Sequence, residues 1–317
     1  MSTICTPSII PSPVQDCADL HRAFKGFACD DEKVIEILGH RNDVQRHELR
    51  QAYTNLYASN LLQKLQAELG GNFERAVLLW MEDAADRDAI IIRDALEGWG
   101  TKDIALIEMI CTRTKSQLQA IRQAYNTRFY RSLDEDIASD TSGDYKKLLL
   151  AYLNNYRPET PQVNMQLAQA DCMELYRAGE GRLGTDEAAI IVILSSRSSA
   201  QLNACFNLYK QTYGHDIEKA MKRETSGNFL NALRAIIKCV HSPAKYFAKV
   251  LYKSMKGLGT DDATLIRVVV TRAEIDMQYI KVEFVGKYHH SLDDMISSDT
   301  SGSYKKFLLA LIGSNKL

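Results

Sequence analysis

One pattern occurs four times along the sequence and keeps its internal spacing without slipping by a residue. It consists of a short turn, an arginine twelve residues after the last residue of the turn, and an acid thirty-nine residues after it. The turns are residues 26–29, 98–101, 182–185 and 257–260. The arginines are Arg41, Arg113, Arg197 and Arg272, and the acids are Glu68, Asp140, Glu224 and Asp299. Such repetition indicates that the chain is built from four copies of one structural unit.

Composition limits what these units can bind. The chain has 317 residues, 45% of them hydrophobic and 25% charged, as in a soluble globular protein with a full core. Its formal net charge is -1, which favours no long-range attraction to nucleic acid or to an anionic membrane. Binding to an anionic surface would therefore need a cation, and we expect no nucleic-acid partner.

The N-terminal segment, the short apolar runs and the cysteines favour a protein that remains in the cytoplasm. Residues 1–15 hold three prolines and no basic stretch followed by an apolar one, so they predict an extended arm and no secretory signal. The longest apolar run, residues 188–194, is too short to span a bilayer. Seven cysteines without a paired C-x-x-C spacing indicate reduced thiols.

The local patterns are helical throughout, and nothing alternates with a period of two. In the second copy, apolar residues from Ile104 to Cys111 recur at helical spacing after the turn. Thr114-x-x-Gln117 resembles a capping box, with Asn42-x-x-Gln45 and Ser198-x-x-Gln201 at the equivalent places. A helix over 84–96 precedes the turn, and Ser142 is placed to cap the last helix of the unit. We therefore expect an all-α protein with five helices in each unit.

A linker interrupts the regular spacing between the second and third units. Residues 154–161 contain two prolines and several polar residues, which disfavour a continuous helix. We therefore expect two units before this linker to form one half of the protein, and the two units after it to form the other.

The turns and the distant acids suit a hard cation. Glycine in a turn between helices permits positive φ, so several carbonyl oxygens can converge on one point. Calcium takes six to eight oxygen ligands, and a carboxylate from elsewhere in the unit can close the shell. With one carboxylate the site binds weakly by itself, and a lipid phosphate can supply the missing oxygens and charge. The pattern therefore predicts calcium as a bridge to an acidic membrane.

An apolar residue stands at the tip of each turn. These residues are Phe27, Trp99, Leu183 and Leu258. A tip has no core to enter, so we expect Trp99, Leu183 and Leu258 to contact the headgroup region of a membrane.

Together these residues resemble the annexins, and the plant annexins in particular, from about residue 14 to residue 312. The resemblance implies four annexin-type repeats of five helices each, arranged as a slightly curved disc, and calcium-dependent binding to acidic phospholipid membranes. It divides the chain into an arm (1–13), repeats over 14–83 and 84–154, a linker (155–162), and repeats over 163–241 and 242–317.

The resemblance also implies which residues hold calcium. In the fourth repeat they are the carbonyls of Met255, Gly257 and Gly259 with the carboxylate of Asp299. The second repeat offers the carbonyls of Leu96, Gly98 and Gly100 with Asp140.

The other two turns depart from the family pattern. In the third, Arg182 replaces the first glycine, while Gly184 and Glu224 remain, so we rank this site third. In the first, Ala28 and Cys29 replace the second glycine and the threonine. We expect the first site, with Gly26 and Glu68, to be weak or absent.

Other functions linked to plant annexins stay open as alternatives. A calcium-permeable ion conductance would need a polar pore, which the four repeated arginines could line if they do not simply cap helix ends. A redox or peroxidase-like role would use His40 as a haem ligand, or Cys111 and Cys239 as redox-active thiols. The sequence holds no compact catalytic triad and no intact phosphate loop, so we expect no enzyme. Self-association on membranes and a scaffold for protein partners are also left open.

Overall fold

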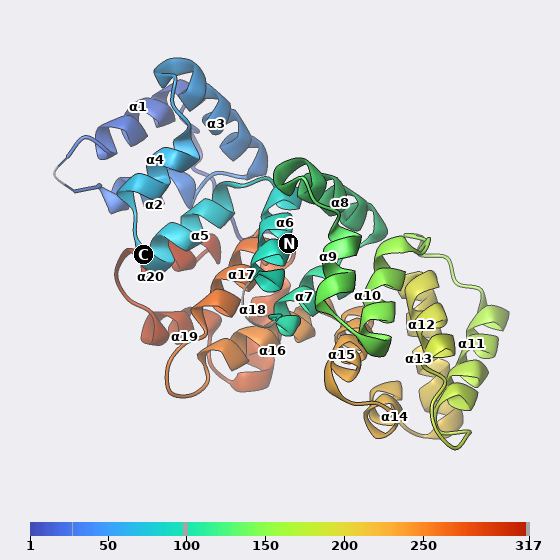
Figure 1. The fold of residues 1–317 in the computed structure, drawn as a ribbon. Helices are drawn as coiled ribbons and strands as arrows, with labels where there is room; N and C mark the ends of the chain where they lie inside the picture. The colour runs from blue at the N-terminus through green and yellow to red at the C-terminus, as the bar shows by residue number, and fades with distance from the viewer. Residues whose placement is uncertain (27, 98–100, 315–317) are drawn as a thin grey trace. The chain divides into compact units, whose positions relative to one another are not determined.

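The computed structural model describes residues 1–26, 28–97 and 101–314, and within these ranges every regular element is an α-helix. The first ten helices are α1 (Pro13–Ala23), α2 (Asp31–Leu38), α3 (Asp43–Tyr57), α4 (Leu61–Glu68), α5 (Gly71–Met81), α6 (Ala84–Leu96), α7 (Asp103–Cys111), α8 (Lys115–Phe129), α9 (Leu133–Asp140) and α10 (Gly143–Asn154). The next ten are α11 (Met165–Ala178), α12 (Glu187–Ser196), α13 (Ser199–Tyr213), α14 (Ile217–Glu224), α15 (Gly227–His241), α16 (Pro243–Met255), α17 (Asp262–Arg272), α18 (Met277–Tyr288), α19 (Leu292–Asp299) and α20 (Gly302–Leu311). The all-α class with five helices in each repeat is confirmed (Figure 1).

Capping residues set where the third helix begins in the first three repeats, whereas the side chain of Asp276 makes no cap bond to α18 in the fourth. Asn42 with Gln45 and Thr114 with Gln117 form complete capping boxes at the starts of α3 and α8. Ser198 caps α13 through its own side chain alone. The side chain of Gln201 instead exchanges two hydrogen bonds with the main chain of Asn164, at 2.8 and 2.9 Å, and so fastens the linker that leads into α11.

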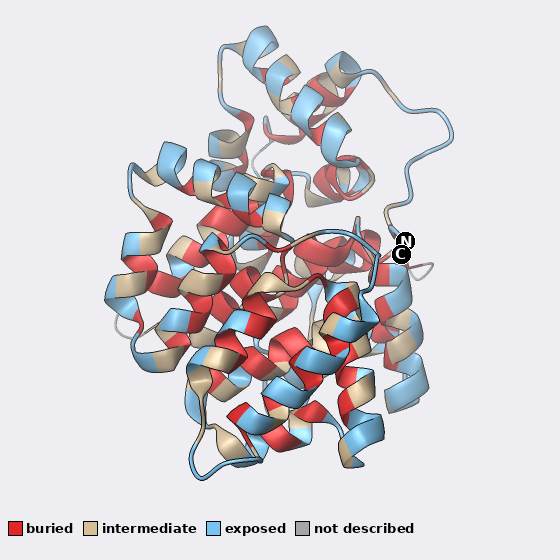
Figure 2. Cartoon of the chain, turned by 90° about the vertical axis from the view of Figure 1, so that its right-hand side faces the viewer, coloured by how far each residue is buried: buried red, intermediate tan, exposed pale blue. Residues whose placement is uncertain are grey.

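One ring in each repeat forms the centre of its core. Tyr53, Tyr125, Tyr209 and Phe284 stand twenty-four residues after the turns, and each is 0% exposed. Buried residues line the helix faces that meet, whereas exposed residues cover the outer faces (Figure 2). The repeated sequence pattern is therefore a pattern of core positions as well as of turns.

The repeats are grouped differently from the expected division at the linker. Residues Met1–Arg87 and Phe247–Leu317 form one compact unit, and Asp88–Tyr246 form another. In the first unit α5 packs against α17 and α20, where the rings of Phe73 and Phe307 meet edge to face at 5.8 Å. In the second unit α10 packs against α12, and α7 against α15. The first repeat thus joins the fourth because their apolar faces match, which no spacing in the sequence reveals.

The linker is held inside the second unit. The guanidinium of Arg157 is buried, donates to the main-chain carbonyl of Arg113 and lies 4.1 Å from the centre of the Tyr152 ring. Residues 155–164 therefore form an anchored connection within one compact unit, and not a joint between two halves.

The repeated arginines hold the first and second helices of each repeat together. In three repeats the partner is an aspartate on the first helix: Arg41 with Asp16, Arg113 with Asp88, and Arg197 with Asp171. The fourth repeat has Phe247 at that position, and Arg272 lies 4.4 Å from the centre of the Phe247 ring and bonds Asp276 through two nitrogens. These side chains therefore have a structural role.

The buried pair of Asp16 and Arg41 should be far more important for stability than an exposed pair on the same helix. Their side chains are 5% and 4% exposed and make two hydrogen bonds, at 2.7 and 2.8 Å. Asp16→Ala leaves a buried guanidinium without its partner, and we expect it to cost about 3–5 kcal/mol in urea unfolding. Asp19→Ala, which breaks the exposed pair with Arg22, should cost less than about 1 kcal/mol. Equal losses in the two variants would contradict this role.

Candidate metal-binding turns

A main-chain hydrogen bond of the same kind closes each turn. The amide of the residue after the turn donates to a carbonyl near the end of the preceding helix, at 2.7 to 3.0 Å. The pairs are Asp30 with Ala23, Lys102 with Ala95, Asp186 with Ala178, and Asp261 with Ser254. The third turn spans one residue more than the others, so its backbone follows a different path between the same two helices.

A second bond ties the turn to its distant acid in three repeats. The hydroxyl of the threonine that ends the turn donates to the main-chain carbonyl of the acid thirty-nine residues later. The bonds run from Thr101 to Asp140 at 3.1 Å, from Thr185 to Glu224 at 3.0 Å, and from Thr260 to Asp299 at 3.2 Å. The fold therefore brings the turn and the acid together in the second, third and fourth repeats.

Glycines give two turns a backbone that other residues rarely adopt. In the fourth turn φ is +129° at Gly257 and +87° at Gly259, and in the third it is +80° at Gly184. This left-handed region is open to glycine at little cost. The predicted ligands Met255, Gly257 and Gly259 thus belong to one turn that is tied to Asp299.

Part of the second site cannot be placed in the same way. Gly98, Trp99 and Gly100 lie outside the described residues, as does Phe27 of the first turn. Leu96 ends α6, and Thr101 connects the end of the turn to Asp140. The assignments of Leu96, Gly98 and Gly100 as ligands and of Trp99 as a membrane contact therefore stay predictions.

A glycine of left-handed conformation also begins the last helix of every repeat. φ lies between +58° and +61° at Gly71, Gly143, Gly227 and Gly302. The expected cap by the Ser142 side chain is not made, and Ser226 and Ser301 likewise form no side-chain cap bond. These helices therefore begin at a glycine of positive φ without a side-chain cap.

The chemical character of the groups suits a hard cation. Among the described residues no group of three or more His, Cys, Asp and Glu side chains is arranged to hold a metal. Each turn offers main-chain carbonyls and one carboxylate, of which Asp140 is exposed and Asp299 half-buried. Oxygen donors of this kind fit calcium and not a thiolate- or imidazole-binding metal. One carboxylate leaves part of the ligand shell to oxygens from outside the chain.

The tip residues of two turns point away from the protein. Leu183 and Leu258 are 102% and 109% exposed, as much as in an isolated peptide. Neither side chain is folded back onto its helices. Exposed leucines at loop tips contribute nothing to a core, so their position favours contact with another apolar phase.

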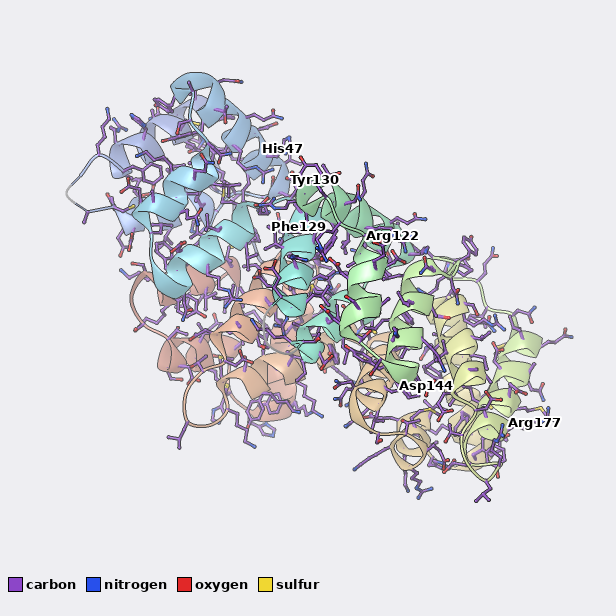
Figure 3. All side chains as sticks on the ribbon, in the orientation of Figure 1. His47, Arg122, Phe129, Tyr130, Asp144 and Arg177 are labelled. Atoms are coloured by element: carbon purple, nitrogen blue, oxygen red, sulfur yellow. The ribbon has the colours of Figure 1, made fainter. Side chains whose placement is uncertain are left out.

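The third turn carries a side-chain tether that the sequence pattern did not indicate. Glu180 accepts hydrogen bonds from His215 at 2.7 Å, Arg223 at 2.9 Å and Tyr209 at 3.0 Å. Arg223 is adjacent to Glu224, so the tether joins the turn to the helix that bears its acid. Figure 3 shows Arg177 on the last turn of α11, the helix that ends just before this segment.

The first turn differs in chemistry from the other three. Cys29 replaces the threonine, and no described hydrogen bond joins its side chain to the carbonyl of Glu68. Ala28 stands where Gly184 and Gly259 have positive φ, a conformation that disfavours a residue with a Cβ. The Glu68 carboxylate lies 3.4 Å from Lys64 on the preceding turn of α4. These differences agree with a weak or absent calcium site here.

The residues named for redox chemistry are engaged or protected. His40 bonds through Nδ1 to the main-chain carbonyl of Cys5 at 2.8 Å, which fastens the N-terminal arm. Burial raises the pKa of the Cys111 thiol, and Cys239 is half-buried. A raised pKa keeps the thiol protonated and unreactive at neutral pH.

Comparisons with known proteins place the chain in one family. The annexin family model matches residues 15–80, 87–152, 170–236 and 246–311, once for each repeat. Annexin D5 of Arabidopsis thaliana is 44% identical over 99% of this chain and 100% of its own length. The solved structure of annexin III superposes with a TM-score of 0.96 at 38% identity, covering 99% of this chain and 97% of that one. Calcium-bound annexin (Sm)1 gives a TM-score of 0.89 at 29% identity, with 99% and 93% covered.

The chain therefore belongs to the annexins, a family known for calcium-dependent phospholipid binding. One relative that is 44% identical to this chain is a plant annexin, which agrees with the resemblance to plant annexins seen in the sequence. No described helix is long and apolar enough to cross a bilayer.

Removal of the bond between Thr260 and Asp299 should weaken calcium binding in the fourth repeat. Thr260→Val keeps the shape of the side chain but removes the donor, and we expect about a fivefold loss of calcium affinity by calorimetric titration. Thr300→Val is the matched control, because the Thr300 hydroxyl bonds to Ile296 within the preceding helix and not to the turn. The same loss in both variants would show that this bond does not position the acid.

The Glu180 tether should release the third turn at acidic pH. Burial raises the pKa of Glu180, but the hydrogen bonds from His215, Arg223 and Tyr209 outweigh it and hold this pKa below its usual range. The stabilisation is therefore present above the ordinary glutamate pKa and is lost as the pH falls through the lowered value. We expect the hydrogen-exchange protection factors of residues 179–186, which correct for the slower intrinsic exchange in acid, to fall at low pH in the wild type. In Glu180→Gln exchange should be fast already at pH 7, and slow exchange there would contradict the tether.

Proposed function

We propose that this protein binds acidic phospholipid membranes when calcium occupies its turns. Calcium would be held by the turn carbonyls of Met255, Gly257 and Gly259 and by the carboxylate of Asp299, and a lipid phosphate would complete the shell. The second turn, with Asp140, and then the third, with Gly184 and Glu224, would act in the same way. The observation that carries this proposal is the threonine bond that brings each turn to its acid.

The incomplete shell is the reason for the dependence on lipid. A single carboxylate gives a site in the weak part of the calcium range. Phosphate oxygens add ligands and negative charge, and the ion removes the repulsion between the acid and the membrane. The exposed leucines at 183 and 258 add an apolar contact beside the bridge. The calcium-bound state of annexin (Sm)1 supports calcium as the ion for this chain also.

We propose a peripheral, cytoplasmic protein without enzymatic activity. The described contacts favour neither of the redox candidates, since His40 is held by the arm and burial protects Cys111. The net charge of -1 supports a membrane partner bridged by a cation and no nucleic acid.

Substitution of the acids should rank the sites. Asp299→Ala and Asp140→Ala should each raise the calcium needed for half-maximal pelleting with phosphatidylglycerol vesicles, by about tenfold, because each removes the only charged ligand of its site. Glu68→Ala should change it little. Asp144→Ala is the control, since Asp144 lies four residues from Asp140 but pairs with Lys147 at 2.9 Å.

Two outcomes would contradict the proposal. Pelleting that is equal with calcium and with a chelator would exclude the ion bridge. Equal shifts for Asp299→Ala, Asp140→Ala and Glu68→Ala would refute the ranking of the turns.

A further inference from the structure

A polar cavity lies within the first compact unit, where the first repeat meets the fourth. Its volume is about 550 Å³, and its walls come from the first turn, the start of α5 and the start of α20. A cavity of this volume accommodates a small molecule or a lipid headgroup. It occupies the place where the first repeat has lost the threonine and the second glycine of the calcium pattern.

The walls are acidic. Asp31 and Glu68 both line the cavity, and none of the described residues that line it is Lys, Arg or His. One oxygen of Asp31 accepts a hydrogen bond from Ser303 at 2.6 Å. Lys64, at 3.4 Å from Glu68, approaches from outside the lining. Two carboxylates, of which Glu68 alone has a cationic partner among the described ion pairs, favour a positively charged occupant.

The pKa of the Cys29 thiol, which lies in the same wall, reflects the negative charge of these carboxylates. Burial first, and then the charges of Asp31, Glu68 and Asp30, raise its pKa to about 12. The thiol therefore stays protonated and neutral at physiological pH, so the cavity is not a thiolate site for a metal or an oxidant.

Aromatic rings complete the lining. Phe73 of α5 and Tyr304 of α20 both border the cavity. Carboxylates and hydroxyls accept hydrogen bonds from N–H groups, and the aromatic residues add apolar surface beside them. This combination differs from the carbonyl-rich turns of the other repeats and suits an ammonium group.

We propose that this cavity binds a primary ammonium group, and that its source is the ethanolamine headgroup of a membrane phospholipid. The lipid source rests on the proposed membrane function, because the cavity is bordered by the first turn and by the two turns that carry Glu68 and follow Asp299. A primary ammonium has three donors for the acceptors on the wall, which a choline group lacks. The extra carboxylate of a serine headgroup would meet Asp31 and Glu68 and be repelled.

The test compares vesicles of equal charge. One set contains phosphatidylglycerol and phosphatidylcholine, and in the other phosphatidylethanolamine replaces the phosphatidylcholine. At fixed calcium we expect the ethanolamine lipid to strengthen wild-type binding about fivefold. Asp31→Asn with Glu68→Gln should abolish this gain while binding to phosphatidylglycerol with calcium remains.

Two further variants separate the cavity from general effects of charge and folding. Gly70 lines the cavity, has φ of -145°, and a Cβ placed there meets nothing within 4 Å, so Gly70→Leu should fill the space without strain and abolish the gain. Glu32→Gln removes an acid that pairs with Lys306 outside the cavity, and it should keep the gain.

The outcomes distinguish the site from the membrane function. If the gain persists in Asp31→Asn/Glu68→Gln and in Gly70→Leu, it reflects membrane packing and the proposal is overturned. If the wild type shows no gain but binds phosphatidylglycerol with calcium, the ethanolamine site is wrong and the proposed function stands.

A soluble probe separates the two sources of an ammonium group. Glycerophosphoethanolamine, whose phosphodiester carries the same single negative charge as in the lipid, is titrated into the wild type without vesicles and followed by NMR shifts of residues that line the cavity. Shifts that vanish in Gly70→Leu, together with the vesicle gain, support the proposal. Shifts without any vesicle gain would overturn the lipid source, and the absence of both would overturn the site.

Discussion

The hydrogen bond from the threonine hydroxyl to the carbonyl of the acid is the interaction on which the candidate sites depend. It joins a turn between the first two helices of a repeat to the end of the fourth helix, thirty-nine residues away. Because the bond uses the main chain of the acid, it leaves the carboxylates of Asp140 and Asp299 available for an ion, whereas the Thr185 hydroxyl also lies 3.5 Å from the Glu224 carboxylate. Where the threonine is absent, as at Cys29, the same scaffold has no such link and an acidic cavity occurs beside the turn.

Much of the fold and of the candidate sites could be predicted from the sequence, because the same residue spacing recurs in all four repeats. Four copies of one spacing predicted the helices, the turns and the acids, and the capping boxes at Asn42 and Thr114 formed as expected. The pairing of the repeats could not be predicted, since it depends on which apolar faces fit, as Phe73 and Phe307 do. The Ser142 side chain was wrongly expected to cap α10: the helix begins at Gly143 with a φ of +60°, and the Ser142 side chain makes no cap hydrogen bond.

The aspartate partners of the repeated arginines were present in the sequence at a fixed distance but were not recognised. Asp16 and Asp88 precede their arginines by twenty-five residues, and Asp171 precedes Arg197 by twenty-six, in the repeat whose turn is one residue longer. The fourth repeat has Phe247 instead, and Arg272 reaches Asp276 while it lies against the ring. The position requires a partner for a buried guanidinium, and more than one residue can supply it.

The four turns can differ in sequence because other residues hold the fold. The arginine pairs and the core rings hold each bundle, so the turns can change without loss of the fold. The third turn uses that freedom for the tether at Glu180, and the first for Ala28 and Cys29. Substitution of the threonine removes one link between turn and acid but leaves the main-chain bond from Asp30 to Ala23 in place. A repeat can therefore lose its calcium pattern, keep its acid, and offer that acid to a different cation.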